Sequence, residues 1–399
     1  MGHEDVVVIG AGPVGLVTAL GLARSGVRVT VLERGDRLND SPRAMVYHHC
    51  TLPFLASLGI LDDCLARGLA GEGLTMRRFS NGDVVHMSLG VLDGLVEHPY
   101  NLHLGQGDLG RIVLEHLKRH PGASVVWNAE FGGLAQDTDG VTVRFTTADG
   151  PAEIRAGWVV GADGARSRVR DALGLEFPGM TWAERFVATN LRYDFGKHGY
   201  GTANMVVDPT HGAIVAQIDA DGLWRCTFSE DESLPVESVP ERIRVFLAEF
   251  LPDDDGYELV HHAPYRMHQR VADRMRVGRV LLAGDAAHAT NPTGGMGLTS
   301  GLFDAETLHE ALAAVVHGSV VDTVLDRYDE CRRKAFLEVA SPRATQLKQL
   351  VYSTRDPAVL DGAFADLHAT ANDPDRTRGR FLATGAARTG SVLDVPATA

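Results

Sequence analysis

The first 33 residues contain the feature that most restricts the fold of this chain. Val6 to Ile9 is an uninterrupted apolar run, mostly β-branched, as expected of a strand that is buried on both faces. Gly10, Gly12 and Gly15 follow at once in the spacing G-x-G-x-x-G, and helical spacing then continues to about Ser25. The order strand, glycine turn, helix is typical of the first unit of a doubly wound α/β sheet.

Each part of this pattern has a physical reason. Gly10 permits the tight turn, Gly12 lets the backbone approach a pyrophosphate, and Gly15 lets the helix pack closely against the strand. A second strand is predicted over residues 27–32, and it ends in Glu33, where a carboxylate can accept hydrogen bonds from ribose hydroxyls. The sequence therefore predicts a parallel sheet that binds a dinucleotide.

A second glycine-rich corner is predicted much later in the chain. Residues 277–283 are mostly apolar and predict a buried strand, which runs into Gly284 and Asp285 and then into a loop with one proline and three glycines. Helical spacing begins at Leu298. Asp285 can accept hydrogen bonds from sugar-like hydroxyls, and the start of the helix offers unpaired N–H groups with a partial positive charge.

A third motif lies between these two. Residues 157–160 predict another buried strand, which ends in Gly161-Ala162-Asp163-Gly164-Ala165-Arg166. Asp163 and Arg166 could contact phosphates or brace the loop. The residues alone leave both interpretations open, because Gly-Asp-Gly turns are common.

In this order and spacing, the three motifs resemble those of the FAD-dependent aromatic hydroxylases, the single-component class A flavoprotein monooxygenases typified by para-hydroxybenzoate hydroxylase. The resemblance covers roughly residues 4–340. It implies that the first motif binds the ADP half of FAD and that Asp163-Gly164 serves both FAD and NAD(P)H. It also implies that Gly284-Asp285 holds the ribityl chain.

The resemblance also assigns single residues to the cofactor. By family position, Arg43 contacts the FAD pyrophosphate and helps control flavin movement, Gln106 contacts FAD, and the backbone at Phe131 lies near the adenine. The complete set of cofactor-binding residues that we expect is Gly10, Gly12, Pro13, Val14, Gly15, Glu33, Arg34, Arg43, Gln106, Phe131, Asp163, Asp285, Pro292, Gly295, Met296, Gly297 and Leu298.

The chain changes character between about residues 177 and 262, where short alternating strands and turn signals replace the glycine motifs. We expect an antiparallel sheet there that lies over the flavin and carries the substrate. The residues that could face this substrate pocket are Tyr193, Met205, His211, Gln217 and Pro292. Each of the first four is equally compatible with sheet packing or a turn surface. Asn81-Gly82, between two extended runs, predicts a hairpin with a type I′ turn.

The predicted fold is α/β: a Rossmann-like FAD-binding domain with an inserted antiparallel β-sheet substrate domain and C-terminal helices. The predicted boundaries are residues 1–73, 98–175 and 265–341 for the FAD-binding domain, 74–97 and 176–264 for the substrate domain, and 342–399 for a C-terminal helical segment and tail. Residues 124–127 and 141–146 are expected to form an antiparallel addition to the FAD-binding domain. A helix break is expected at Ser341-Pro342, and the last thirty residues are expected to be loosely ordered.

Composition narrows the class of protein further. The net charge of −14 argues against a nucleic-acid partner. The four cysteines are scattered without a C-x-x-C pair, which indicates a reducing, cytoplasmic compartment and argues against the flavin disulfide reductases, which need a paired redox-active thiol. No signal peptide precedes the first strand, and no apolar run is long enough to suggest a membrane partner. No metal-ligand set is evident, and we expect a monomer or homodimer.

The function that these observations favour is NAD(P)H-dependent hydroxylation of an aromatic or phenol-like small molecule with FAD and O2. The resemblance implies a route through a C4a-hydroperoxyflavin, so that the cofactor performs the difficult chemistry and no nucleophile or metal triad is required. An epoxidase or Baeyer–Villiger-type oxygenase would use the same intermediate and remains an alternative. A non-catalytic FAD-binding redox module is the alternative from a different class. A flavin-dependent halogenase is disfavoured, because the W-x-W-x-I-P signature is absent.

Overall fold

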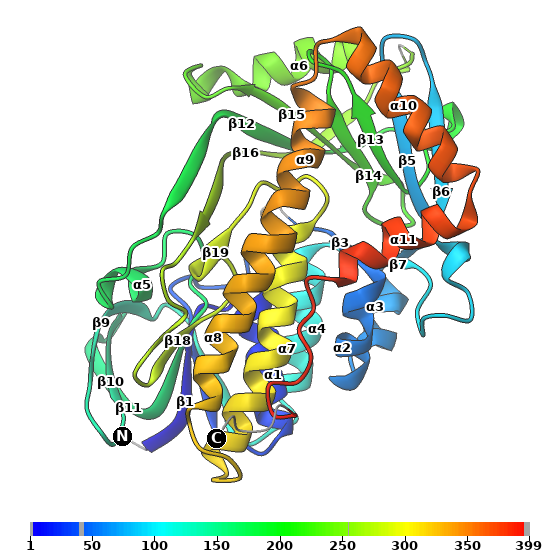
Figure 1. Ribbon diagram of the computed structural model, residues 1–399. Helices are drawn as coiled ribbons and strands as arrows, with labels where there is room; N and C mark the ends of the chain where they lie inside the picture. Colours follow the sequence, from blue (N-terminus) through cyan, green and yellow to red (C-terminus); the bar gives the residue numbers. More distant parts are fainter. Residues whose placement is uncertain (1–2, 40–43, 254, 395–399) are drawn as a thin grey trace.

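The computed structural model describes residues 3–39, 44–253 and 255–394, and two large sheets dominate it (Figure 1). The first sheet has the strand order β17-β18-β11-β1-β2-β8, with β10 attached to β11 and β9 to β10. Its strands are β1 (His3–Ile9), β2 (Val29–Leu32), β8 (Ala123–Val126), β9 (Glu130–Gln136), β10 (Val141–Thr147), β11 (Gly150–Gly161), β17 (Arg276–Val277) and β18 (Val280–Leu282).

The centre of this sheet is parallel, which confirms the α/β prediction. β1 pairs in parallel with β2 and β11, β2 with β8, and β11 with β18. Val6, Val7 and Val8 have no exposed surface. Helix α1 (Pro13–Arg24) packs on β1, β2 and β8, and it is flanked by α4 (Gln106–Leu117) and α7 (Met296–Val316). The carboxyl ends of these strands therefore meet at one edge, where α1 begins.

Two details of the first sheet differ from the predictions. Residues 124–127 were expected to be antiparallel, but β8 lies parallel to β2, because α4 acts as a crossover helix that returns the chain in the same direction. The expectation for residues 141–146 is confirmed, since β10 is antiparallel to both β9 and β11. The strand predicted over 277–283 is interrupted: β17 and β18 form a tight antiparallel hairpin, and Gly278 turns it with a φ of 60°.

The second sheet has the order β19-β16-β12-β15-β14-β13-β5-β6. It is antiparallel except where β13 meets β5 in parallel. The expected hairpin of β5 and β6 is present, but its turn is not type I′, because only Gly82 has a positive φ and its N–H bonds to the carbonyl of Arg78. The strands are β5 (Gly73–Arg78), β6 (Val84–Ser88), β12 (Gly179–Arg192), β13 (Ala203–Val207), β14 (Ala213–Gln217), β15 (Leu223–Asp231), β16 (Glu258–Val271) and β19 (His288–Ala289).

The C-terminal part is more ordered than its composition predicted. Helices α8 (Val324–Ala335) and α9 (Ser341–Tyr352) form one long rod along the molecule (Figure 1), joined by a π-helical segment, Phe336–Ala340. The expected break at Pro342 is absent, because the wider π turn precedes the proline, which has no N–H to donate. Beyond the rod lie α10 (Pro357–Ala371) and α11 (Pro374–Gly385), and α11 falls in the last thirty residues, which were expected to be loosely ordered.

These last helices are ordered by packing against the second sheet. Phe364 of α10 and Phe381 of α11 share an apolar cluster with Met76 of β5 and Phe186 of β12. Burial of such aromatic side chains overrides the polar composition of the segment. The C-terminal helices therefore form part of the wall around the second sheet.

Shorter elements complete the fold. A small sheet has the three strands β3-β7-β4. No helix among the described residues is long and apolar enough to cross a membrane. The remaining elements are β3 (Val46–Tyr47), β4 (Leu69–Gly71), β7 (Asn101–His103), α2 (Leu52–Ser57), α3 (Leu61–Arg67), α5 (Arg168–Ala172) and α6 (Val239–Phe250), with short 3₁₀ turns at His49–Thr51, Leu89–Leu92, Phe195–His198, Val236–Ser238 and Gly284–Ala286.

Candidate active site

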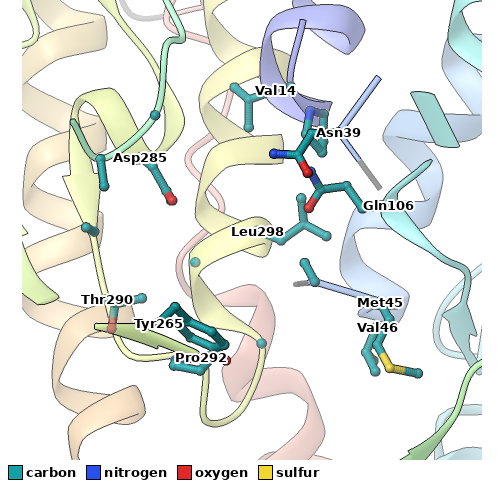
Figure 2. Close-up of a pocket in the computed structure, with 18 of the residues that line it drawn as sticks. Val14, Asn39, Met45, Val46, Gln106, Tyr265, Asp285, Thr290, Pro292 and Leu298 are labelled. Carbon is teal, nitrogen blue, oxygen red and sulfur yellow. The ribbon is translucent and has the colours of Figure 1, made fainter. Parts of the chain in front are cut away.

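A cavity of about 1820 Å³ extends from the start of α1 to the second sheet and the C-terminal helices. Figure 2 shows Asp285 on one side of the start of α7, with Asn39 and Gln106 on the other side and Leu298 between them. Tyr265 and Pro292 lie farther along, opposite Met45 and Val46. A pocket for one small ligand typically measures roughly 300–1,000 Å³, so this cavity can hold a dinucleotide and a second molecule.

The glycines of the first turn have distinct structural roles. Gly10 has a φ of 107°, and a Cβ there would lie 2.5 Å from the carbonyl oxygen of Ala162. A Cβ at Gly15 would lie 2.1 Å from the carbonyl oxygen of Gly10, so both positions exclude any side chain. Gly12 lines the cavity, and a Cβ there would meet nothing within 4 Å. The open face of Gly12 at the start of α1 therefore provides space for a phosphate group.

Glu33 lies at the end of β2 beside this turn. Its Oε2 accepts a hydrogen bond from the N–H of Ala11 at 2.8 Å, and its Oε1 accepts one from the N–H of Gly35 at 2.8 Å. The carboxylate is half-buried and lines the cavity. Because both oxygens keep further lone pairs, they can still accept hydrogen bonds from hydroxyl groups.

Asp163 braces its own loop. Its Oδ1 accepts a hydrogen bond from the Ser167 hydroxyl at 2.5 Å, and its Oδ2 accepts from the N–H groups of Arg168 and Val169 at 2.7 and 3.1 Å. Burial nevertheless raises the pKa of the Asp163 carboxyl. Of the two interpretations left open by the sequence, the bracing role is therefore observed, although Asp163 also lines the cavity.

Arg170 joins the loop that contains Asp163 and Ala165 to the loop after β18. Its Nη1 donates to the carbonyl of Ala286 at 3.0 Å and its Nη2 to that of Ala165 at 3.1 Å, while the guanidinium lies 3.8 Å from the ring centroid of Phe177. The sequence contained no signal for this role, since Arg170 stands among other arginines on a short helix. The arginine fixes two cavity loops relative to each other.

A fully buried charged cluster supports the loop that holds Asp285. Asp304 of α7 accepts hydrogen bonds from the Gly284 N–H at 2.9 Å, from His288 Nε2 at 2.7 Å and from Arg332 Nε at 2.8 Å. Burial alone would raise the pKa of Asp304, but His288 and Arg332 lower it below its ordinary value. The cluster holds Gly284 in place and leaves Asp285 exposed to the cavity.

The loop before α7 is held in an unusual backbone conformation. Gly294 and Gly295 both have positive φ angles, 83° and 69°, which strongly favour glycine. His48 Nε2 lies 2.9 Å from the Gly294 carbonyl oxygen. Burial lowers the pKa of His48, and the charge of Arg343 lowers it further against the opposing effect of the Gly294 carbonyl. His48 is therefore a neutral donor that fixes this loop at the cavity wall.

Comparisons with known proteins agree with this geometry. A family model described as an FAD binding domain matches residues 3–341. The chain is 45% identical over 376 residues to 6-hydroxy-3-succinoylpyridine 3-monooxygenase HspB of Pseudomonas putida (strain DSM 28022 / S16), which covers 94% of this chain and 96% of that protein. The chain belongs to the FAD-dependent aromatic hydroxylases. This hydroxylase is also 44% identical to para-nitrophenol 4-monooxygenase of Pseudomonas sp. (strain WBC-3), over 86% of each chain.

Solved structures give the same assignment. The hydroxylase superposes on the crystal structure of p-nitrophenol 4-monooxygenase PnpA from Pseudomonas putida DLL-E4 with a TM-score of 0.94, at 42% identity over 97% of this chain and 99% of that one. It also matches aklavinone-11 hydroxylase in a ternary complex with FAD and aklavinone, with a TM-score of 0.78 at 28% identity over 88% and 70% of the two chains. FAD is the cofactor and NAD(P)H the co-substrate of this hydroxylase.

The structure brings most of the predicted cofactor residues to the cavity of the hydroxylase. Gly15 and Met296 do not line it, because Gly15 lies beneath the turn and the Met296 side chain is buried beside Phe303 and Phe336. Arg43 lies outside the described residues. Those that line the cavity are Gly10, Gly12, Pro13, Val14, Glu33, Arg34, Gln106, Phe131, Asp163, Asp285, Pro292, Gly295, Gly297 and Leu298.

Of the five predicted substrate residues of the hydroxylase, two line the cavity and three do not. Met205 and Pro292 line the cavity. Tyr193 was wrongly expected there. Its hydroxyl donates to Asp253 at 2.9 Å, and its ring belongs to the apolar cluster between the second sheet and α6. His211 is also corrected, since it stacks on Phe79 and its Nε2 lies 2.9 Å from Glu249 Oε2.

Gln217 is the third correction. Its side-chain amide donates to the carbonyl of Asp219 at 2.9 Å, and its backbone carbonyl accepts from His103 Nδ1 at 2.8 Å. The three corrected residues share one cause. Each polar group has its hydrogen-bond partner outside the cavity, on α6 (Glu249), just after α6 (Asp253) or in a turn of the sheet (Asp219), which sequence alternation cannot reveal.

Sequence reasoning missed the side chains that line the far end of the cavity in the hydroxylase. On β15, Arg225 and Thr227 line the cavity while Trp224, Cys226 and Phe228 face the opposite core. This strict alternation was a signal that the sequence did contain. The C-terminal helices gave no such signal, and their cavity-lining residues are Arg343, Gln346, Leu347, Leu350, Arg380, Phe381 and Thr384.

Proposed function

We propose that the substrate of this FAD-dependent aromatic monooxygenase is a hydroxylated six-membered aromatic ring. The observation that carries this proposal is the single cavity that joins the glycine turn to the second sheet and the C-terminal helices. The names of two relatives support it, because one acts on a 6-hydroxypyridine and the other on para-nitrophenol. O2 and NAD(P)H are the remaining reactants.

The residues at the first end of the cavity fit FAD. Gly12 leaves open the space that a Cβ would fill, and the start of α1 presents N–H groups to an anion. We place the pyrophosphate at this turn, the adenosine ribose at Glu33 and the ribityl chain at Asp285. The adenine would lie near Phe131, and Gln106, Pro292, Gly295, Gly297 and Leu298 would contact the flavin half. Bound FAD supplies the activation of O2.

The other residues of the chain bind and orient the ring and exclude water. Met45, Met205 and Leu347 give the far end apolar walls, which displace water from a reacting aromatic compound. Thr227 and Tyr265 line the same region and offer hydroxyl groups. The ring would lie between Pro292 and the face of β13, so that its position is set by shape and by a few polar contacts.

The test is substrate-stimulated oxidation of NAD(P)H by FAD-loaded protein. We expect 4-nitrophenol, hydroxypyridines or related phenols to raise the rate at least tenfold, about 1.4 kcal/mol of barrier, with a product that retains the ring and gains one oxygen atom. An epoxide, in which the new oxygen bridges two ring carbons and aromaticity is lost, would instead indicate an epoxidase, and an ester or lactone would indicate a Baeyer–Villiger oxygenase. If none of these compounds stimulates the oxidation, the proposal is wrong.

A matched pair of variants tests whether the substrate binds in the cavity. Met205→Trp should fill the substrate end and abolish the stimulation while FAD remains bound. Met180→Trp changes the same residue type at a position that is 47% exposed and outside the cavity, and it should leave the stimulation unchanged. Equal behaviour of the two variants would contradict the location of the substrate.

We further propose the domain division 1–73, 98–175 and 265–341 for FAD, 74–97 and 176–264 for substrate, and 342–399 for the C-terminal segment. We also propose a monomer or homodimer in the cytoplasm. Four free thiols (Cys50, Cys64, Cys226 and Cys331) support a reducing compartment. Sedimentation of the purified protein at several concentrations tests the oligomeric state, and a tetramer would contradict it.

A further inference from the structure

Two arginines from the C-terminal helices line the substrate end of the cavity. Arg343 belongs to α9 and Arg380 to α11, and both are partly buried. Arg343 lies one helical turn before Leu347, whose Cδ1 is 2.6 Å from where a Cβ on Gly294 would be. The two guanidinium groups therefore line the same cavity as the loop before α7, from the side formed by the C-terminal helices.

Neither guanidinium has a carboxylate partner in the described parts of the chain. Arg343 Nη2 donates to two neutral acceptors, the carbonyl of Arg380 at 3.2 Å and the hydroxyl of Thr384 at 3.0 Å. The charge of Asp366 acts on Arg380, but the salt bridge of Asp366 is with Arg376. Burial lowers the pKa of Arg343, and the nearby charge of Arg380 lowers it further.

This arrangement differs from that of two more deeply buried arginines in the same molecule, Arg185 and Arg332. Arg185 is paired with Glu230 at 2.6 Å, and Arg332 is paired with Asp304 at 2.8 Å. Partial burial of two like charges is unfavourable unless an opposite charge compensates them. No carboxylate among the described residues forms a salt bridge with Arg343 or Arg380, while both residues line the cavity.

We propose that Arg343 and Arg380 bind a carboxylate group of the aromatic substrate. Guanidinium groups match the planar geometry of a carboxylate and form charge-assisted hydrogen bonds with it. The ring would lie toward Pro292 and Met205, and the carboxylate would lie at the end formed by α9 and α11. This inference rests on the proposed function, and it narrows the substrate class to aromatic rings that carry an acidic side chain.

The experiment compares each acid with its neutral amide. The probes are 4-hydroxybenzoate, 4-hydroxyphenylacetate, 3-(4-hydroxyphenyl)propanoate and 4-(4-hydroxyphenyl)butanoate, each beside its primary amide. Binding to the FAD-loaded protein is followed by the change in flavin absorbance, without NAD(P)H. For at least one pair, the wild type should bind the acid at least tenfold more tightly than the amide, and Arg380→Gln should reduce this preference below threefold.

Two further variants complete the test. Arg378→Gln alters an arginine of the same helix that lies outside the cavity and pairs with Asp375, and it should keep the full preference. Arg380→Lys should retain part of it, because the charge remains while the planar fork is lost. No hydrogen bond of the Arg380 side chain is found within the described residues, and the Arg380 carbonyl that accepts from Arg343 stays in the glutamine variant, which should therefore fold and bind FAD as the wild type does.

The inference is overturned if no acid is preferred over its amide, or if Arg380→Gln keeps the preference of the wild type. These outcomes are separate from the proposed function, since binding is read without turnover. Neutral phenols that are hydroxylated, together with no preference for acids, would leave the proposed function intact and refute the carboxylate site. A preference that depends on Arg380 would support the site even if a different reaction follows.

Discussion

The two ends of the cavity are built in different ways. At the cofactor end, the turn from Gly10 to Gly15 and the acid Glu33 come from one short stretch of chain, and backbone geometry determines the shape. At the substrate end, Met205, Arg225 and Arg380 come from three separate parts of the chain, and side chains determine the shape. The glycine turn and Glu33 at the first end are therefore local in sequence, whereas the second end depends on tertiary packing.

This difference follows from what each end must bind. FAD is the same molecule in every member of the family, and its pyrophosphate requires close backbone approach, which few sequences permit. The substrate varies between relatives, as their names indicate. Side chains on a rigid sheet and on added helices can change without disturbing the fold. The four predictions that follow test this contrast.

The largest effect is expected at the buried cluster behind the cofactor end. Asp304→Asn removes the charge that compensates Arg332, and both side chains have no exposed surface. Loss of one partner of a buried pair should lower the free energy of unfolding by about 3–5 kcal/mol. Urea unfolding of the FAD-loaded protein measures it. Asp375→Asn, at an 86% exposed carboxylate, serves as the control and should change stability by no more than about 0.5 kcal/mol. If Asp304→Asn lowers the free energy of unfolding by less than about 1 kcal/mol, the cluster does not stabilise the fold behind the cofactor end.

The second effect concerns FAD affinity without loss of fold. Asp285→Ala should remove acceptors for the ribityl hydroxyls, at about 1.5–3 kcal/mol, which corresponds to roughly 10- to 150-fold weaker binding. Fluorescence titration of the apoprotein with FAD gives the dissociation constant. Asp149→Ala, on an exposed turn of the first sheet, is the matched control. If Asp285→Ala binds FAD with the dissociation constant of the wild type, the ribityl chain does not contact Asp285.

The third effect concerns His103 of β7, which joins the three-stranded sheet to β14 of the second sheet. Burial lowers the pKa of His103 to about 4, against the opposing effect of its bond to the Gln217 carbonyl. Below pH 6.5 the unfolded chain takes up a proton that the folded protein refuses, so stability falls as the pH drops toward 4. At pH 5 the cost is about 2 kcal/mol. His103→Gln should lose less stability between pH 7 and pH 5 by about this amount, and equal losses in both proteins would contradict the assignment.

The smallest effect tests a corrected substrate residue. Tyr193→Phe removes the hydrogen bond to Asp253 on the far layer of the second sheet and should lower stability by about 1 kcal/mol. Because Tyr193 does not line the cavity, the KM for the aromatic substrate should stay within twofold of the wild type. A large rise in KM with unchanged stability would show that Tyr193 contacts the substrate and that the correction is wrong.

The sequence predicted the cofactor end well, because its signals are local. Val6 to Gly15 specify strand, turn and helix through spacing and glycine alone, and Asp285 follows its strand directly. The antiparallel sheet was also predicted, from alternation and turn residues. The order of α11 was not predicted, since its polar composition conceals the packing of Phe381 on a sheet that is distant in the chain. The roles of Arg170 and Asp304 were missed for the same reason, because each joins segments far apart in sequence.

The central claim is that one cavity brings FAD and an aromatic ring together for oxygen transfer from O2. The most direct test is turnover under ¹⁸O₂ with the phenol selected by the NAD(P)H assay. The account predicts that the product contains one ¹⁸O atom, that one NAD(P)H is consumed for each product formed, and that Met205→Trp binds FAD but forms no labelled product. Unlabelled product, or stoichiometric H2O2 with an unchanged phenol, would contradict it.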